Sequence, residues 1–193
     1  MKHALLMTFL TCCLWPAAAF GQDDFKRERT PSNAEAKDKL EGKTPPKLQV
    51  EGWVNTDGEA VTLESLRGKV VVLDFWGVWC GPCRAAMPHL KELYEKHKAE
   101  GLVIIGVHTK NKGDEMPAFV KDKELPWPVA VDVDGKTVKA FAVDSFPDYY
   151  LIDRAGKLRV ADLANKELDR AVAALLKEKP PVPKQDPKSP QDP

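Results

Sequence analysis

Apolar and polar residues follow one another along the chain in blocks that predict strands separated by helices. Residues 70–76 (VVVLDFW) are almost entirely apolar, which is typical of a central strand covered on both faces. Residues 81–98 follow with apolar positions at helical spacing, and Gly101 stands just after their end. A second apolar run at 102–108 predicts another buried strand. The order strand, helix, strand indicates an α/β domain.

The flanking segments extend this pattern at both ends. Residues 48–54 and 60–63 surround the turn-forming sequence Asn55-Thr56-Asp57-Gly58, so they predict an N-terminal β-hairpin. The C-terminal half predicts helices at 114–123, 136–141 and 165–178 and strands at 129–131, 148–152 and 158–162. The last two strands flank an Asp-Arg-Ala-Gly turn and predict a second hairpin. Together these elements predict an α/β sandwich built on a mixed sheet.

The N-terminus has the pattern of a targeting signal. Residues 1–21 have a short basic start, an apolar run and then small residues, which is the layout of a secretory signal peptide. We expect cleavage after Ala19 or Gly21, with an uncleaved membrane anchor as the alternative. Cleavage removes two of the four cysteines and leaves one pair. The expected location is therefore the periplasm or another extracytoplasmic space.

Two further segments differ in composition from the domain between them. Residues 22–46 carry many charges of both signs without apolar periodicity, which predicts a disordered linker. Residues 180–193 are proline-rich, which predicts an extended, disordered tail. Residues 47–179 contain no internal repeat and are expected to form one domain.

Composition excludes two classes of protein. The 29 Lys and Arg residues balance 29 Asp and Glu residues, whereas a nucleic-acid-binding protein usually has a clear basic excess. Charged residues make up 30% of the chain, which argues against a polytopic membrane protein. A globular protein remains, and its cysteines require an explanation.

The remaining cysteines occur in the sequence Trp79-Cys80-Gly81-Pro82-Cys83, at a predicted junction of strand and helix. Backbone amides at a helix N-terminus favour the thiolate of the first cysteine. The second cysteine lies one turn further in, where it can close a disulfide. We therefore expect Cys80 to be an exposed nucleophile and Cys83 a partly buried resolving thiol. Pro82 suits the first helical turn, which does not need its missing N–H.

Other uses of a cysteine pair fit less well. A zinc site needs two further ligands at metal spacing, and the predicted mature chain has no second cysteine pair. Covalent haem attachment needs a histidine after the second cysteine, where this chain has Arg84. A structural disulfide would close too small a loop to constrain the unfolded chain much. We expect redox chemistry without a metal or another cofactor.

The chain resembles the thioredoxin superfamily, and within it the exported TlpA/ResA-like thiol–disulfide oxidoreductases. The resemblance rests on residues 72–84 (VLDFWGVWCGPCR) and 143–147 (VDSFP) and extends over about 50–177. It implies a three-layer sandwich, with helices on both faces of a central mixed sheet. It also implies a cis-proline at Pro147, facing the cysteine pair.

The resemblance implies a role for each matching residue. Cys80 attacks a substrate disulfide, Cys83 resolves the mixed disulfide, and Asp74 assists proton transfer from a buried position where burial is expected to raise its pKa. The expected substrate-binding residues are Trp79, Gly81, Pro82, Phe146 and Pro147.

The expected partners are a disulfide-containing protein substrate and a membrane thiol electron donor, and we expect a monomer. The Gly-Pro dipeptide between the cysteines is similar to that of reducing thioredoxins, whose potential is about −270 mV. A disulfide oxidase or isomerase is the alternative within the same chemistry. A thiol peroxidase would need Pro at position 73 and Thr at 77, where this chain has Leu73 and Gly77. A binding module without catalysis is the alternative outside enzymes.

Some positions depart from the family pattern. Asp148 stands where a threonine is common, so its charge could raise the pKa of Cys80 or select cationic substrates. Many relatives carry a glutamate just after the strand 102–108, whereas this chain continues with Thr109, and the acid role would rest on Asp74 alone. His108 ends that strand, and we expect a local hydrogen bond there. Two aspartates in the sequence Val-Asp-Val-Asp-Gly are interpreted as part of a turn rather than as calcium ligands.

Overall fold

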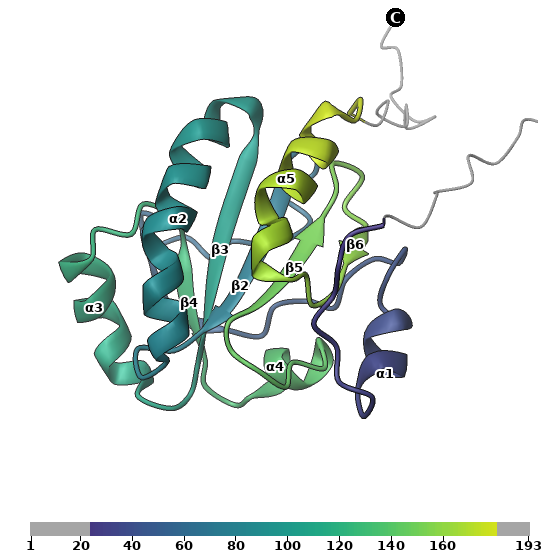
Figure 1. Cartoon of the computed structure of the whole chain (residues 1–193). Helices are drawn as coiled ribbons and strands as arrows, with labels where there is room; N and C mark the ends of the chain where they lie inside the picture. The colour runs from purple at the N-terminus through teal and green to yellow at the C-terminus, as the bar shows by residue number, and fades with distance from the viewer. Residues whose placement is uncertain (1–23, 181–193) are drawn as a thin grey trace, which may run out of the picture.

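A computed structural model describes residues 24–180, which form one six-stranded mixed sheet between two layers of helices and loops (Figure 1). The strands are β1 (Glu51–Val54), β2 (Val70–Trp76), β3 (Leu102–Thr109), β4 (Val129–Asp132), β5 (Asp148–Ile152) and β6 (Leu158–Val160). The helices are α1 (Ala34–Asp38), α2 (Gly81–His97), α3 (Met116–Asp122), α4 (Lys136–Ala140) and α5 (Leu168–Lys177). Short 3₁₀ helices at Lys98–Glu100, Gly113–Glu115 and Asn165–Glu167 adjoin α2, α3 and α5.

The sheet has the order β1-β4-β3-β2-β5-β6. Strands β2, β3 and β4 are parallel, and the others pair antiparallel with their neighbours. Strand β2 is central and all seven of its residues are buried, as its apolar sequence predicts. The α/β sandwich and its mixed sheet are thus confirmed.

Alternate residues of β2 belong to different halves of the core. Val70, Val72 and Trp76 pack with buried side chains of α2, α3 and α5, and Figure 1 shows α2 and α5 together over that face. Val71, Leu73 and Phe75 face the other side, where α4 and residues 40–66 supply the cover. The period of two along β2 therefore places Asp74 on the α2 side of the sheet.

The predicted N-terminal hairpin does not form. Residues 60–63 are not a strand, and β1 pairs instead with β4, at the far edge of the sheet. The Asn55 side chain donates hydrogen bonds to the carbonyls of Leu125 (2.7 Å) and Trp127 (3.0 Å), just before β4. These tertiary hydrogen bonds hold the end of β1 beside β4, and they cannot be inferred from turn composition.

Residues 24–46 differ from the expected disordered linker. Phe25 belongs to the core, Arg27 forms a β-bridge with Leu163, and the short helix α1 follows. Many charges in this segment are paired, for example Arg27 with Glu41 at 2.8 Å. Composition alone does not predict this order, because it shows the charged groups but not the partners that pair with them in the fold.

Other expectations concern the ends of elements and of the chain. The helix expected at 165–178 begins as a 3₁₀ turn, and its N-cap is Ala164 rather than Asn165. The predicted signal peptide lies outside the described residues. Of the predicted tail, the structure describes only Pro180. Between residues 24 and 180, no helix has both the length and the apolar character that crossing a membrane requires.

Candidate active site

The cysteine pair lies where β2 gives way to α2. Cys80 is the N-cap of the 17-residue helix α2, with extended backbone angles, and Pro82 lies in the first turn. The Cys83 N–H donates a hydrogen bond to Cys80 Sγ at 3.1 Å. The sulfur thus satisfies a backbone donor that the start of a helix would otherwise leave without a partner.

Cys80 and Cys83 form a disulfide, with their Cα atoms 5.3 Å apart. Both residues are buried in this oxidised form, with exposures of 4% and 2%. The expectation that Cys80 is exposed is therefore wrong for the disulfide state. The reason is that Val78, Met87 and Tyr149 belong to the same apolar cluster as both cysteines.

Exposed residues lie beside the disulfide. Trp79 is 41% exposed, and Gly81 and Pro82 are also exposed. The Trp79 ring meets the Phe146 ring edge to face, with centroids 5.6 Å apart. The peptide bond between Phe146 and Pro147 is cis, as predicted. The structure thus brings two sequence motifs about 65 residues apart into one surface.

Asp74 is buried in β2, with an exposure of 3%. Burial raises its pKa to about 7, because the charged carboxylate loses hydration. Its Oδ1 atom has no hydrogen-bond partner among residues 24–180. A carboxyl group in this setting can hold or release a proton close to neutral pH.

His108 supports the loop that precedes the cysteines. Its Nε2 accepts a hydrogen bond from the Val78 N–H at 2.9 Å, and its Nδ1 donates to the Thr109 carbonyl at 2.5 Å. This pattern requires the neutral ring, and burial correspondingly lowers the pKa of His108. The expected local hydrogen bond is confirmed, together with a second one that the sequence did not indicate.

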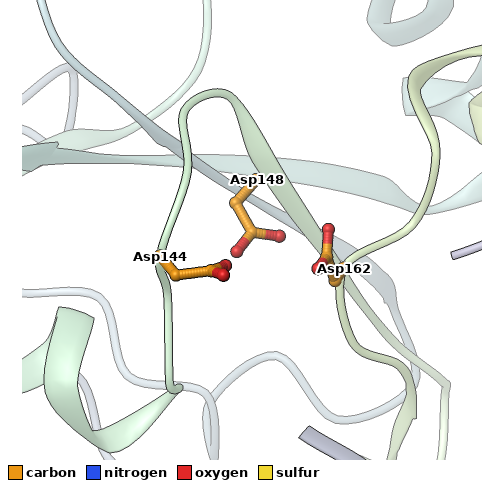
Figure 2. A group of neighbouring side chains, drawn as sticks. All are labelled: Asp144, Asp148 and Asp162. Atoms are coloured by element: carbon orange, nitrogen blue, oxygen red, sulfur yellow. The ribbon is translucent and has the colours of Figure 1, made fainter. Parts of the chain in front are cut away.

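Asp148 does not face the cysteine pair as a free charge. Asp148 and Asp162 are buried and Asp144 is exposed, and Figure 2 shows their three carboxylates gathered in one place. Lys37 Nζ donates hydrogen bonds to Asp144 at 3.0 Å, Asp148 at 2.9 Å and Asp162 at 2.6 Å. The hypothesis that Asp148 selects cationic substrates is therefore wrong, because a lysine of the chain itself is its partner.

The carboxylate oxygens of these aspartates lie within 4.8 Å of one another, a spacing that could also hold a metal ion. The Lys37 ammonium already supplies the cation at that position. The pair Asp132 and Asp134 behaves as predicted for a turn: Asp132 accepts a hydrogen bond from the Val138 N–H at 2.7 Å, and Asp134 pairs with Lys136.

Comparison with known proteins assigns the family. The model of the AhpC/TSA family matches residues 42–161. The chain belongs to the AhpC/TSA family. Thiol-disulfide oxidoreductase ResA of Bacillus thuringiensis subsp. konkukian is 34% identical over 136 residues, which cover 70% of this chain and 76% of that protein. ResA of Bacillus subtilis is 32% identical over 118 residues, which cover 61% and 64% of the two chains.

Solved structures agree with this family assignment. A Chlorobium tepidum protein described as a thiol:disulfide interchange protein DsbE has a TM-score of 0.63 and 30% identity, over 70% of this chain and 97% of that one. A thiol:disulfide interchange protein from Bacteroides sp. has a TM-score of 0.61 and 25% identity, over 72% and 91%. This AhpC/TSA-family chain is a ResA-like thiol–disulfide oxidoreductase with a thioredoxin-like fold, and its substrates contain disulfides.

Lys37 is the residue near this site that sequence reasoning missed. It lies in a five-residue helix within a highly charged segment, and nothing in the local pattern separates it from its exposed neighbours. It also precedes the region that the AhpC/TSA model matches. Only the tertiary structure shows that it is buried.

Proposed function

We propose that this thiol–disulfide oxidoreductase acts outside the cytoplasm as a reductant of protein disulfides. The exchange chemistry is carried by the position of Cys80 Sγ at the N-terminus of α2, where it accepts the Cys83 N–H, and the reducing direction is supported by the Gly81-Pro82 dipeptide, which is similar to that of reducing thioredoxins. Once the disulfide is reduced, the same amide and the helix dipole favour the Cys80 thiolate over the thiol. Cys80 is then the nucleophile and Cys83 the resolving thiol.

Reduction of a substrate proceeds in two exchanges. The Cys80 thiolate attacks one sulfur of the substrate disulfide, the substrate S–S bond breaks, and the leaving thiolate takes up a proton. Cys83 then loses its proton and attacks Cys80, which releases the second substrate thiolate and restores the Cys80–Cys83 disulfide. Two electrons pass from the enzyme dithiol to the substrate, and a thiol donor must return them.

Asp74 is proposed as the proton acceptor for Cys83. It lies on the α2 side of the sheet, on the strand that leads directly to the cysteine motif. A pKa near 7 matches a group that takes a proton in one half of a cycle and returns it in the other. Its burial keeps bulk water from competing for that proton.

The substrate is proposed to bind across the two loops beside the disulfide. Trp79, Gly81 and Pro82 supply one side, and Phe146 and Pro147 supply the other. The edge-to-face contact of Trp79 with Phe146 supports a single continuous surface. Backbone groups of Phe146 are proposed to pair with an extended substrate segment, because a strand-like peptide binds chiefly through its main chain.

The location and the electron donor are inferred from the sequence and the chemistry. The signal-peptide pattern of residues 1–21 supports export to the periplasm or another extracytoplasmic space, with or without retention as an anchor. A reductant in an oxidising compartment needs electrons from elsewhere, which supports a membrane thiol protein as the donor. We propose that the protein acts as a monomer.

The reduction potential of the Cys80–Cys83 pair tests the direction of electron flow. We would equilibrate the protein in glutathione and dithiothreitol buffers and follow tryptophan fluorescence. A value near about −270 mV is expected for a reductant. A value above about −180 mV, the range of disulfide isomerases and oxidases, would overturn the proposal and make the protein a disulfide donor.

A further inference from the structure

The N-terminal segment, residues 24–46, contacts the region around the cis-proline through one buried lysine. Lys37 is fully buried (0% exposed) and donates hydrogen bonds to carboxylates of Asp144, Asp148 and Asp162. A lysine is almost never fully buried unless it is paired. The position of Lys37 is thus explained by these three partners and not by the helix in which it lies.

Two of those partners enclose the loop that carries the cis-proline. Asp144 precedes Phe146 and Pro147 by two and three residues, and Asp148 follows them as the first residue of β5. A single ammonium group therefore joins the two ends of the five-residue loop 144–148. Asp162, the third partner, connects the same ammonium to the segment that follows β6.

Additional contacts from the N-terminal segment reach the same loop. Thr30 Oγ1 donates a hydrogen bond to Asp144 Oδ2 at 2.9 Å, and Asn33 Nδ2 donates to the Ala142 carbonyl at 3.4 Å. On the other side, the Glu28 N–H donates to the Asp162 carbonyl at 3.0 Å. The segment thus contacts both chain regions whose aspartates meet at Lys37.

The charges of the cluster are consistent with a lasting ion pair. Burial lowers the pKa of Lys37, but the interactions of its ammonium with Asp162, Asp148 and Asp144 raise it by more. The net shift is upward, so Lys37 stays charged. Burial and the charge of Asp162 raise the pKa of Asp148, and the Lys37 ammonium beside it opposes that rise. The Asp148 carboxyl also accepts a hydrogen bond from the Tyr150 hydroxyl at 3.3 Å.

We propose that Lys37 is a positioning residue for substrate binding, which holds the loop 144–148 so that Phe146 and Pro147 face Trp79 and the cysteine pair. The proposal rests on the proposed substrate surface. Lys37 does not contact the cysteines. Its loss should therefore weaken the binding of protein substrates that lie across the loop, while the reactivity of Cys80 toward small disulfides stays the same.

The test uses the full chain with Lys37→Met, which removes the ammonium and keeps an unbranched side chain. Lys39→Met is the matched control, because Lys39 belongs to the same short segment but is exposed and pairs only with Glu35 in the described structure. Each reduced protein is mixed with insulin or with 2-hydroxyethyl disulfide, and its oxidation is followed by tryptophan fluorescence.

For Lys37→Met we expect the half-saturating insulin concentration to rise about tenfold, while the limiting rate changes less than about twofold. The rate with 2-hydroxyethyl disulfide and the reduction potential should match those of Lys39→Met. Equal behaviour of both variants toward insulin would overturn the proposal. So would an equal loss of rate with both disulfides, because that result indicates general damage to the site.

A milder variant covers the case in which Lys37→Met does not fold. Asp144→Asn removes one carboxylate charge from a partly exposed position and leaves Asp148 and Asp162 with Lys37. We expect a smaller rise in the half-saturating insulin concentration and faster amide exchange in residues 142–148. No change in either quantity would contradict the proposal. Failure of the wild-type protein to react with any disulfide would instead reject the proposed function.

Discussion

Asp74 and Tyr149 lie opposite each other on the neighbouring strands β2 and β5, and each has a buried oxygen without a hydrogen-bond partner among residues 24–180. Both residues lie on the α2 side of the sheet, in the layer that contains the cysteines. Burial, together with the charge of Asp74, raises the pKa of Tyr149. Unpaired buried polar groups are rare in proteins and need a reason, which proton transfer at the cysteine pair would supply.

The variant Asp74→Asn tests the role of this carboxyl group in the second exchange. In the wild type, resolution of the mixed disulfide should accelerate as pH rises toward about 7, because Asp74 accepts a proton only when it is ionised. The variant should lose this dependence and resolve about 100-fold more slowly at pH 7. Rapid-quench measurement of mixed-disulfide decay would show both effects. An unchanged profile would exclude Asp74 as the proton acceptor.

Asp74 also makes the stability of the oxidised protein depend on pH. The pKa of Asp74 is about 7 in the folded protein, against 3.8 for an unperturbed aspartate. Between these two pKa values, the folded state retains a proton that the unfolded state has lost. The contribution of Asp74 to the free energy of unfolding is therefore fully present below about pH 4 and is lost as pH rises through 7. Between pH 5 and pH 8, the wild type should lose about 2–3 kcal/mol more than Asp74→Asn.

Denaturant unfolding of the disulfide-bonded proteins at both pH values measures that difference. Asp148 also has a raised pKa, but it is present in both proteins and cancels in the comparison. Asp122→Asn is a suitable control, since the Asp122 side chain is exposed. Parallel pH curves for the wild type and Asp74→Asn would show that Asp74 ionises normally.

The two cysteines should differ when each is replaced by serine. Cys83→Ser keeps the nucleophile at the helix N-terminus but removes the resolving thiol, so it should accumulate a mixed disulfide with a protein substrate. Cys80→Ser should form little, because Cys83 is buried and lacks the N-cap position of Cys80. Non-reducing gel electrophoresis after acid trapping would measure both adducts. Equal trapping by the two variants would contradict the assignment of Cys80 as the nucleophile.

Trp79 should contribute to substrate binding more than to chemistry. Replacing it with alanine removes the exposed ring and its contact with Phe146, so the half-saturating insulin concentration should rise about tenfold, equivalent to about 1.4 kcal/mol. Val133→Ala is the control, because Val133 is equally exposed but follows β4. Stopped-flow fluorescence is limited here by the loss of a tryptophan, so insulin precipitation is the better readout. An effect on the limiting rate alone would contradict a docking role.

Local sequence was sufficient for the centre of this fold and for the disulfide. The apolar run of β2, the cysteine motif and the apolar spacing of α2 are adjacent in the chain and specify one another. The same holds for the turn at Asp132 and for the hydrogen bond of His108 to Thr109, whereas the hydrogen bond of His108 to Val78 joins residues 30 positions apart and comes from the tertiary structure. The cis bond at Pro147 was predicted through family resemblance rather than from physical pattern.

Sequence by itself therefore determined the order of the elements at the redox site: an apolar strand, the two cysteines and the helix that begins at them. Tertiary structure alone decided where β1 pairs, because the carbonyls that bind Asn55 come from residues 70 and 72 positions away. It also decided that Lys37 is buried, because its three carboxylate partners are more than 100 residues distant. Periodicity reports which face of an element is apolar, whereas a buried ion pair depends on groups that only the completed fold brings together.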